Sequence, residues 1–297
     1  MSEYVMQQML NALTLGSLYA LVAIGFSLIF GVIRLVNFAH GDLMMIGAFS
    51  TLGLLQVAGP LWALIPVLVL GIGFLTGSLI EKVVFRSVRN APMITGFVVT
   101  LSLSVVIQNL GQMFLGAQPR SLRLPEFFSS RVEFAGLSMP AIDIVIPVTT
   151  IVLAIAVTRF VYRSRVGAAM RAVSENIVAA QLMGISINRV VMVAFGLGSA
   201  LACLAGFFWG GKFGQIDPIM GLAPGLKAFI ATIIGGVGSI PGAILGGYIL
   251  GFAEVMFVGF LPPEYASFRD TFVFGTLIVI LLIRPQGIFG IDEEERA

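Results

Sequence analysis

The chain has 297 residues, of which 58% are hydrophobic and only 11% are charged. With a mean hydropathy of +1.02, this composition lies outside the range of water-soluble domains and predicts an integral membrane protein. The formal net charge is +2, and the basic residues form short clusters between apolar runs. Intrinsically disordered and nucleic-acid-binding proteins are therefore excluded.

Segments without Asp, Glu, Lys or Arg mark the predicted membrane crossings, because about 20 apolar residues span the hydrocarbon core of a bilayer. The second segment is too long for one helix, and Gly59-Pro60 near its middle predicts two, since proline ends a helix. Charged end residues that can reach the interface extend the fourth segment to a crossing over 141–162. The charge-free segments are 4–33, 43–80, 90–119, 144–158, 190–211, 228–253 and 271–283.

The predicted fold class is all-α: a polytopic integral membrane protein with about eight transmembrane helices, some of them broken or re-entrant. We expect one transmembrane domain over 1–297. A β-barrel is excluded because runs such as 144–157 do not alternate between apolar and polar residues. Glycines that are four residues apart, such as Gly73 and Gly77, predict close packing of helix backbones.

Two stretches predict interruptions inside the membrane. The polar hexapeptide 37–42 stands abruptly between apolar segments and is either an interfacial turn with Asp42 as a helix N-cap or a broken segment that lines a passage. The segment 235–247 is dense in glycine, which indicates a broken or re-entrant helix whose backbone is buried or faces water. Its glycines are Gly235, Gly236, Gly238, Gly242, Gly246 and Gly247.

Other polar residues at membrane depth need partners or a function, because lipid offers them none. Gln108, Asn109 and Gln112 either form interhelical hydrogen bonds or face the passage, with 108 and 112 on one helical face. Glu254 requires an inward partner, such as an amide on a neighbouring helix, or a place near a membrane rim. Cys203 is predicted to be a buried free thiol.

Lysine and arginine in short loops predict which side faces the cytoplasm. Lys82, Arg86 and Arg89 lie in one loop, and five arginines lie in or beside 163–189. We place both loops in the cytoplasm, and the N-terminus and a structured loop over 117–140 outside.

Within 163–189 the pattern predicts a short amphipathic helix, with Ser174 as N-cap and Gly184 after its end. This helix lies on the membrane or docks on a partner. An acidic tail follows at 288–297.

The pattern contains no phosphate-binding loop, and His40 is the sole histidine, which argues against a metal cluster or a nucleophilic triad. We therefore expect a protein that is not an enzyme and that needs no cofactor and no metal.

Several stretches together resemble the permease subunits of branched-chain amino acid ABC importers, of the LivH type. The resemblance spans the chain from end to end. It is carried by Asn37 to Asp42 with Gly47, Gly167 to Gly184, Gly235 to Gly247 followed by Glu254, and Arg284 to Gly290.

The resemblance implies an inner-membrane subunit that moves branched-chain amino acids with a homologous LivM-type permease, two cytoplasmic ATPases and a periplasmic or extracellular binding protein. It also implies that 163–189 is the coupling loop that contacts an ATPase. The alternatives are a permease for urea, short amides or another small solute, or a stand-alone secondary transporter. Expected route residues are Asn37, His40, Gly41, Asp42, Gln108, Asn109, Gln112, Gly236, Gly238 and Glu254. Expected coupling residues are Arg171, Ser174, Glu175, Asn176, Ala179, Met183 and Gly184.

Overall fold

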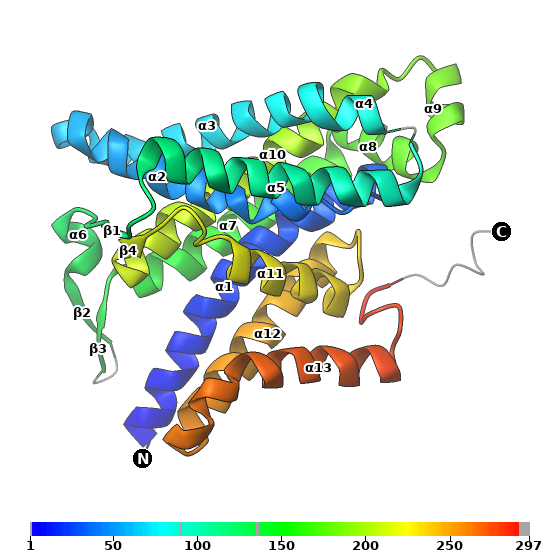
Figure 1. The fold of residues 1–297 in the computed structure, drawn as a ribbon. Helices are drawn as coiled ribbons and strands as arrows, with labels where there is room; N and C mark the ends of the chain where they lie inside the picture. Colours follow the sequence, from blue (N-terminus) through cyan, green and yellow to red (C-terminus); the bar gives the residue numbers. More distant parts are fainter. Residues whose placement is uncertain (1, 90, 135–136, 291–297) are drawn as a thin grey trace.

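The computed structural model describes residues 2–89, 91–134 and 137–290. Long helices lie side by side across the molecule, and two shorter ones, α11 and α13, complete the helical body (Figure 1). Their bounds are α1 Ser2–Ile33, α2 Asp42–Ala58, α3 Ile65–Ile80, α5 Met93–Leu115, α7 Ile142–Arg163, α10 Ile187–Phe213, α11 Leu222–Gly235, α12 Ile240–Phe260 and α13 Arg269–Ile283.

The predicted fold class is confirmed. Six stretches of the described residues are long and apolar enough to cross a membrane, and one of them, Phe38–Val88, contains both α2 and α3. The expected division of this stretch at Gly59-Pro60 is correct, because α2 ends at Ala58 and a 3₁₀ segment η2 (Gly59–Leu64) leads into α3.

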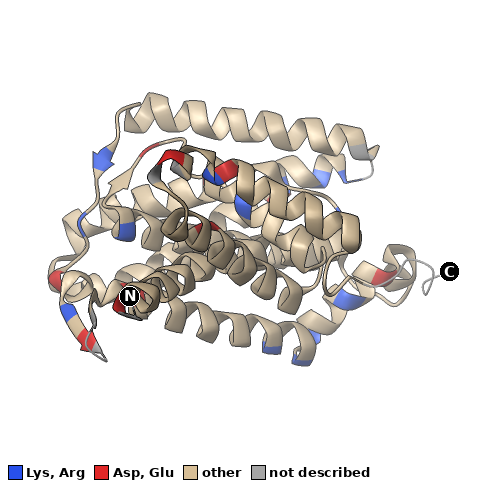
Figure 2. Cartoon of the chain, turned by 90° about the horizontal axis from the view of Figure 1, so that it is seen from below, with Lys and Arg blue, Asp and Glu red and all other residues tan. Residues whose placement is uncertain are grey.

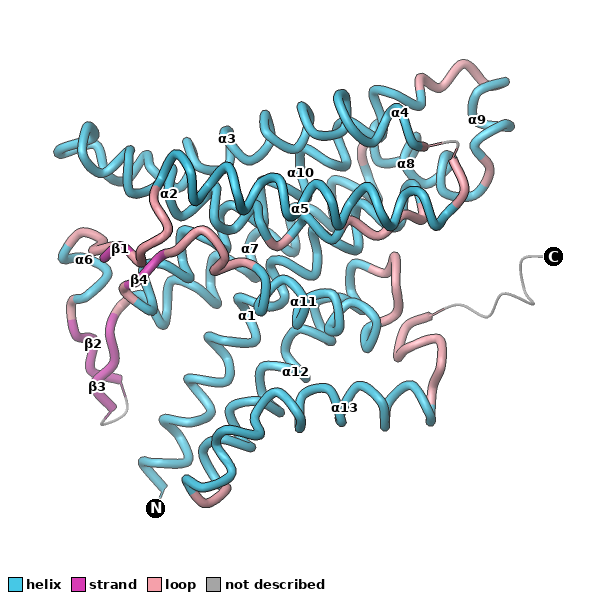
Figure 3. Tube along the Cα trace, in the orientation of Figure 1, coloured by secondary structure: helices cyan, strands magenta, loops and turns pink. Residues whose placement is uncertain are grey.

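The strands of the described residues all lie at one end of the molecule, which we call the sheet end (Figure 3). There β1 (Arg120–Ser121) pairs antiparallel with β4 (Gln215–Ile216), and β2 (Arg131–Phe134) pairs with β3 (Leu137–Pro140). Helix α6 (Glu126–Ser129) lies beside them, so the described parts of the loop 117–140, namely 117–134 and 137–140, are structured as predicted. The opposite end, the α9 end, carries α4 (Arg86–Val88), α8 (Arg165–Glu175) and α9 (Ile177–Leu182).

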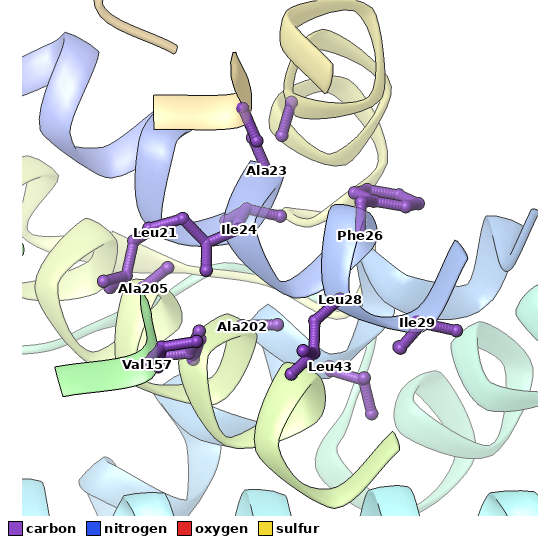
Figure 4. Packing of buried hydrophobic residues seen from close by; sticks show 14 of the residues in the cluster. Leu21, Ala23, Ile24, Phe26, Leu28, Ile29, Leu43, Val157, Ala202 and Ala205 are labelled. Atoms are coloured by element: carbon purple, nitrogen blue, oxygen red, sulfur yellow. The ribbon is translucent and has the colours of Figure 1, made fainter. Parts of the chain in front are cut away.

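Helices α1 and α10 form the centre of the core, and 83% of the most apolar window of each is buried. Leu21, Ile24 and Leu28 of α1 pack near Ala202 and Ala205 of α10 (Figure 4). Lipid tails are as apolar as leucine, so burial of apolar surface gives little drive for helices to associate, and close backbone packing must supply it. The small residues of α10 serve that purpose.

Glycines bring neighbouring backbones into contact where the four-residue spacing predicted it. Gly73 of α3 faces Ala200 of α10, Gly77 faces Ser199, and Gly251 of α12 faces Gly16 of α1. Helix α2 crosses α10 in the same way, with Gly206 of α10 against the carbonyl group of Met44. The packing interpretation of these glycines is therefore confirmed, and Cys203 beside them is buried as expected.

Both predicted interruptions exist, but one is shorter than expected. Between α1 and α2 the chain leaves the helix at Arg34 (φ 50°) and makes a 3₁₀ turn, η1 (Phe38–His40). Between α11 and α12 the break covers only 236–239, not the whole of 235–247. The helix resumes at Ile240 because the Ser239 side chain accepts a hydrogen bond from the Gly242 amide at 3.2 Å and caps it.

The end of α11 is closed by a later part of the chain. The amide groups of Ile288 and Phe289 donate to the carbonyl groups of Ile234 and Gly235, each at 2.9 Å. These contacts satisfy carbonyl groups that a helix end leaves free. They fix the first two residues of the predicted tail, whereas its acidic residues, within 291–297, lie outside the described residues.

We expect Gly206→Ala to destabilise the protein by about 1–3 kcal/mol, the usual cost of overpacking a core, because the new methyl group would collide with the Met44 carbonyl group. Thermal unfolding of the purified protein in detergent measures the change. Gly71→Ala is the matched control, since nothing lies within 4 Å of the position of its Cβ atom. If both variants unfold alike, backbone contact at Gly206 is not limiting.

Candidate functional site

The two interrupted segments meet at their glycines. Gly41 lies against Gly221 and Gly225 at the beginning of α11, where an added Cβ atom would lie 3.0 Å from the Gly225 Cα atom. Asn37, which is 1% exposed, accepts a hydrogen bond from the Ala39 amide at 3.1 Å and holds the turn that leads to Gly41. The sequence folds this way because the small residues let α11 approach η1 without a side chain between them.

Asp42 is the first residue of α2 and is 1% exposed. Its Oδ1 atom accepts a hydrogen bond from Gln108 Nε2 of α5 at 2.8 Å, and the same Nε2 atom lies 3.1 Å from Ser104 Oγ. Its Oδ2 atom has no hydrogen-bond partner among the described residues. Of the two alternatives for 37–42, the one with Asp42 as the N-cap of α2 is wrong: Gly41 holds that position without a side-chain bond, and Asp42 binds Gln108 of α5 instead.

Helix α5 presents amides on its outer surface. Gln108 is partly buried, while Asn109 and Gln112 are exposed; Asn109 returns a hydrogen bond to the Val105 carbonyl group at 2.7 Å. Around them Val105 and Met113 are exposed by 57% and 78%. An apolar surface interrupted by amides at membrane depth is poorly suited to lipid and better suited to a protein partner or a water-filled passage.

The predicted route residues His40, Gly236 and Gly238 are not part of the group formed by Asp42 and the amides of α5. His40 is fully buried, with its ring 4.4 Å from that of Phe26. Gly236 and Gly238 follow the far end of α11, a helix of 14 residues and thus about 21 Å long. Gly238 instead lines a small cavity of about 90 Å³ together with Arg171 and Ser174 of α8.

Glu254 is the centre of an ion-pair cluster and is 3% exposed. Its Oε1 atom lies 2.9 Å from Lys227 Nζ of α11 and 3.2 Å from Arg269 Nε of α13, and its Oε2 atom accepts a hydrogen bond from the Tyr19 hydroxyl group at 2.7 Å. Lys227 also binds Asp270 Oδ1 at 2.8 Å. Two cations balance two carboxylates, so the buried charges are neutralised within the protein.

The sequence pattern indicated that Glu254 needs a partner, but it did not indicate Lys227, Arg269 and Asp270, the charged residues of the cluster. Lys227 directly precedes the charge-free segment 228–253 and Glu254 directly follows it. The pairing of Lys227 with Glu254 is not evident when 228–253 is taken as a single interrupted element. Because the chain reverses at 236–239, α11 and α12 form a hairpin, and the two residues that bound the segment come to the same height. Two opposite charges flanking a glycine-broken segment were the available signal.

The short helix predicted within 163–189 is present, but it begins later. Helix α9 starts at Ile177, and Asn176 is its N-cap, accepting a hydrogen bond from the Ala179 amide at 2.9 Å. The Ser174 cap is wrong because Ser174 and Glu175 lie in the last turn of α8. Gly184 adopts φ 78°, the left-handed conformation expected after the helix.

Apolar side chains of α9 are strongly exposed. Val178, Leu182 and Met183 are 65%, 84% and 82% exposed, and Ala179 lies among them. Arg171 of α8 donates to the Val161 carbonyl group and packs 5.6 Å from the Tyr162 ring, which ties α8 to α7. The region is thus a fixed support with an uncovered apolar helix, as a docking element requires.

Residues 8–282 match the family model described as the permease component of branched-chain amino acid transport systems. The chain is 38% identical to the high-affinity branched-chain amino acid permease protein LivH of Escherichia coli K12, over 99% of this chain and 98% of that protein. The chain belongs to this permease family. It is 35% identical to BraD of Pseudomonas aeruginosa, over 98% and 97% of the two chains. No solved structure matches it.

Membership of the permease family confirms the resemblance that the motifs indicated. It also confirms the prediction of a multi-pass protein of the bacterial inner membrane. More distant relatives include the ribose import permease protein RbsC of Haemophilus influenzae, 23% identical over 82% of this chain and 75% of that protein. These relatives are transport components rather than enzymes. Most Lys, Arg, Asp and Glu residues of the permease lie near helix ends and loops (Figure 2).

We expect Lys227→Met to destabilise the permease by about 3–5 kcal/mol, the usual cost of removing one partner of a buried pair. The double variant Lys227→Met/Glu254→Leu should be less destabilised than the single one. In the single variant Arg269 alone balances both Glu254 and Asp270, whereas the double variant leaves Arg269 beside Asp270 only. Thermal unfolding in detergent compares the three proteins. A double variant that is the least stable of the three would contradict this account.

Proposed function

We propose that the chain is the permease subunit of an ATP-driven importer that moves branched-chain, hydrophobic amino acids across the inner membrane. Near-complete coverage by LivH and BraD carries this proposal. A stand-alone ion-coupled carrier needs free ionisable groups at membrane depth. Here Glu254 is fully engaged by Lys227, Arg269 and Tyr19, which favours the importer over the stand-alone carrier. Asp42 is held by Gln108 through one oxygen, and its other oxygen has no partner among the described residues.

We place the α9 end in the cytoplasm. The loops that meet there carry Lys82, Arg86 and Arg89 on one side and the arginines of 163–189 on the other. Two cytoplasmic ATPases dock at this end, and α9 with its exposed Val178, Leu182 and Met183 enters a groove on one of them. The coupling residues are then Ala179 on α9 and Met183 directly after its end, supported by Arg171, Ser174, Glu175, Asn176 and Gly184.

We place the translocation route along α5. The second permease, of the LivM type, covers the exposed surface of α5, and the amides of Gln108, Asn109 and Gln112 face the passage between the subunits together with Asp42 behind them. Asn37, His40 and Gly41 belong to the turn against which α5 packs and shape this route from within the protein. Glu254 is engaged in its own ion-pair cluster, and Gly236 and Gly238 follow the far end of α11. Such a passage binds its substrate weakly, so an external binding protein supplies the selectivity.

The docking of α9 is tested in vesicles that contain the permease pair, both ATPases and the binding protein. We expect Leu182→Asp, deletion of 175–183 and Gly184→Val to leave insertion intact but to reduce substrate-stimulated ATP hydrolysis. Leu182→Asp places a charge in the apolar contact, and valine adopts the conformation of Gly184 poorly. ATPases that co-purify and couple normally after the deletion would show that α9 does not carry the contact.

The route is tested by uptake of labelled leucine and urea in the same vesicles. Alanine at Gln108, Asn109 or Gln112 is expected to change the rate of leucine uptake more than its apparent affinity, because the amides lie along a weak passage. Exchange of the binding protein should change the preferred substrate. Binding of leucine to the isolated permease pair with micromolar affinity, about −8 kcal/mol, would instead place a selectivity site in the membrane.

A further inference from the structure

A cavity of about 380 Å³ lies between α4 and α9, at the end of the molecule where these helices are neighbours (Figure 1). Its walls combine two arginines with apolar and amide side chains from the segment that contains α9. The lining residues are Arg86, Arg89, Ile177, Gln181, Ile185, Ser186, Ile187 and Asn188.

The arginines of this cavity are incompletely neutralised. Glu81 is fully buried, and its two oxygens bind both guanidinium groups, Oε2 to Arg86 at 3.0 Å and Oε1 to Arg89 at 2.5 Å. Two cations thus share one carboxylate. Arg89 also donates to Asn188 Oδ1 at 3.0 Å, but its Nε atom is buried without a partner among the described residues. Arg86 remains 36% exposed. The site has an excess of one positive charge.

Helix α9 connects this cavity to the exposed apolar residues. Ile177 and Gln181 line the cavity, while the neighbouring Val178 and Leu182 are exposed. A protein that covers Leu182 and Met183 therefore also reaches the cavity mouth. A carboxylate fits the excess charge, because a guanidinium group binds it with two parallel hydrogen bonds.

We propose that the cavity receives an acidic side chain of the ATPase that docks on α9. The inference rests on the proposed function and extends it, since it states the chemistry of the partner surface: an apolar groove for α9 with a carboxylate beside it. The ion pair fixes the orientation of the ATPase against α4, and so against the end of α5 that follows it in the chain.

The test compares Arg86→Gln and Arg86→Glu with Lys82→Glu in the full complex. Lys82 lies one helical turn from Arg86, is exposed and is absent from the cavity lining, so its reversal controls for the general loss of positive charge. Arg86 is preferred to Arg89 because its loss leaves Glu81 paired. We expect Arg86→Glu to weaken ATPase binding at least about tenfold, Arg86→Gln less, and Lys82→Glu little.

The acidic residues of the ATPase surface are then replaced one at a time with lysine. Lysine in place of the partner carboxylate should restore binding to the Arg86→Glu permease. Equal binding by Arg86→Glu and wild type, while Leu182→Asp abolishes it, would overturn this inference alone. No loss with either variant would overturn the α9 docking itself. The last arm measures the thermal stability of the permease without ATPases, with and without phosphatidylglycerol. If phosphatidylglycerol stabilises the wild type but not Arg86→Glu, the cavity binds a lipid headgroup and the inference is overturned.

Discussion

Backbone polar groups inside the hydrocarbon region have to be satisfied by the protein itself, because lipid supplies no hydrogen bonds. This constraint explains why the irregular segments are where they are. The turn at 34–41 interrupts the α-helices with a single 3₁₀ turn at 38–40 and is covered by the start of α11. In the break at 236–239, Gly236 is covered by the segment 287–290, whereas Val237 and Gly238 are exposed.

The same constraint determines how the helices associate. The centre of the fold, α1 and α10, is rich in small residues, and its neighbours approach through glycines such as Gly47 and Gly206. Helix α5 differs, since it rests on η1 and touches α2 at few places, with Gly111 beside Met45. A closely packed centre with one helix that makes few contacts suits a passage, because local opening is easiest where buried contacts are few.

Most of the fold was predictable, because segment length, proline and glycine act locally. Gly59-Pro60 divides α2 from α3 whatever surrounds it, and the glycine spacing indicates close contacts without naming the partner helix. The ion pairs were not predictable, because they depend on which helices are neighbours. Asp143 pairs with Lys212 at 2.5 Å, and Lys227 pairs with Glu254. The sequence predicted Asp143 only as the end of a crossing, and for Glu254 it predicted an inward partner without indicating Lys227. The cap of α9 was misplaced because Ser174 and Asn176 are both good caps, and only packing of α8 decides between them.

The ion-pair cluster around Glu254 also bears on how the chain enters the membrane during synthesis. A single charge at the centre of an inserting helix costs about 2.5–3.5 kcal/mol. Lys227 and Glu254 belong to consecutive helices of one hairpin, and Arg269 and Asp270 are adjacent in the chain. Each unit is therefore electrically neutral as it leaves the translocon. The hairpin of α11 and α12 can thus enter the bilayer without an isolated charge, and α13 can join it by exchanging ion pairs with Lys227 and Glu254.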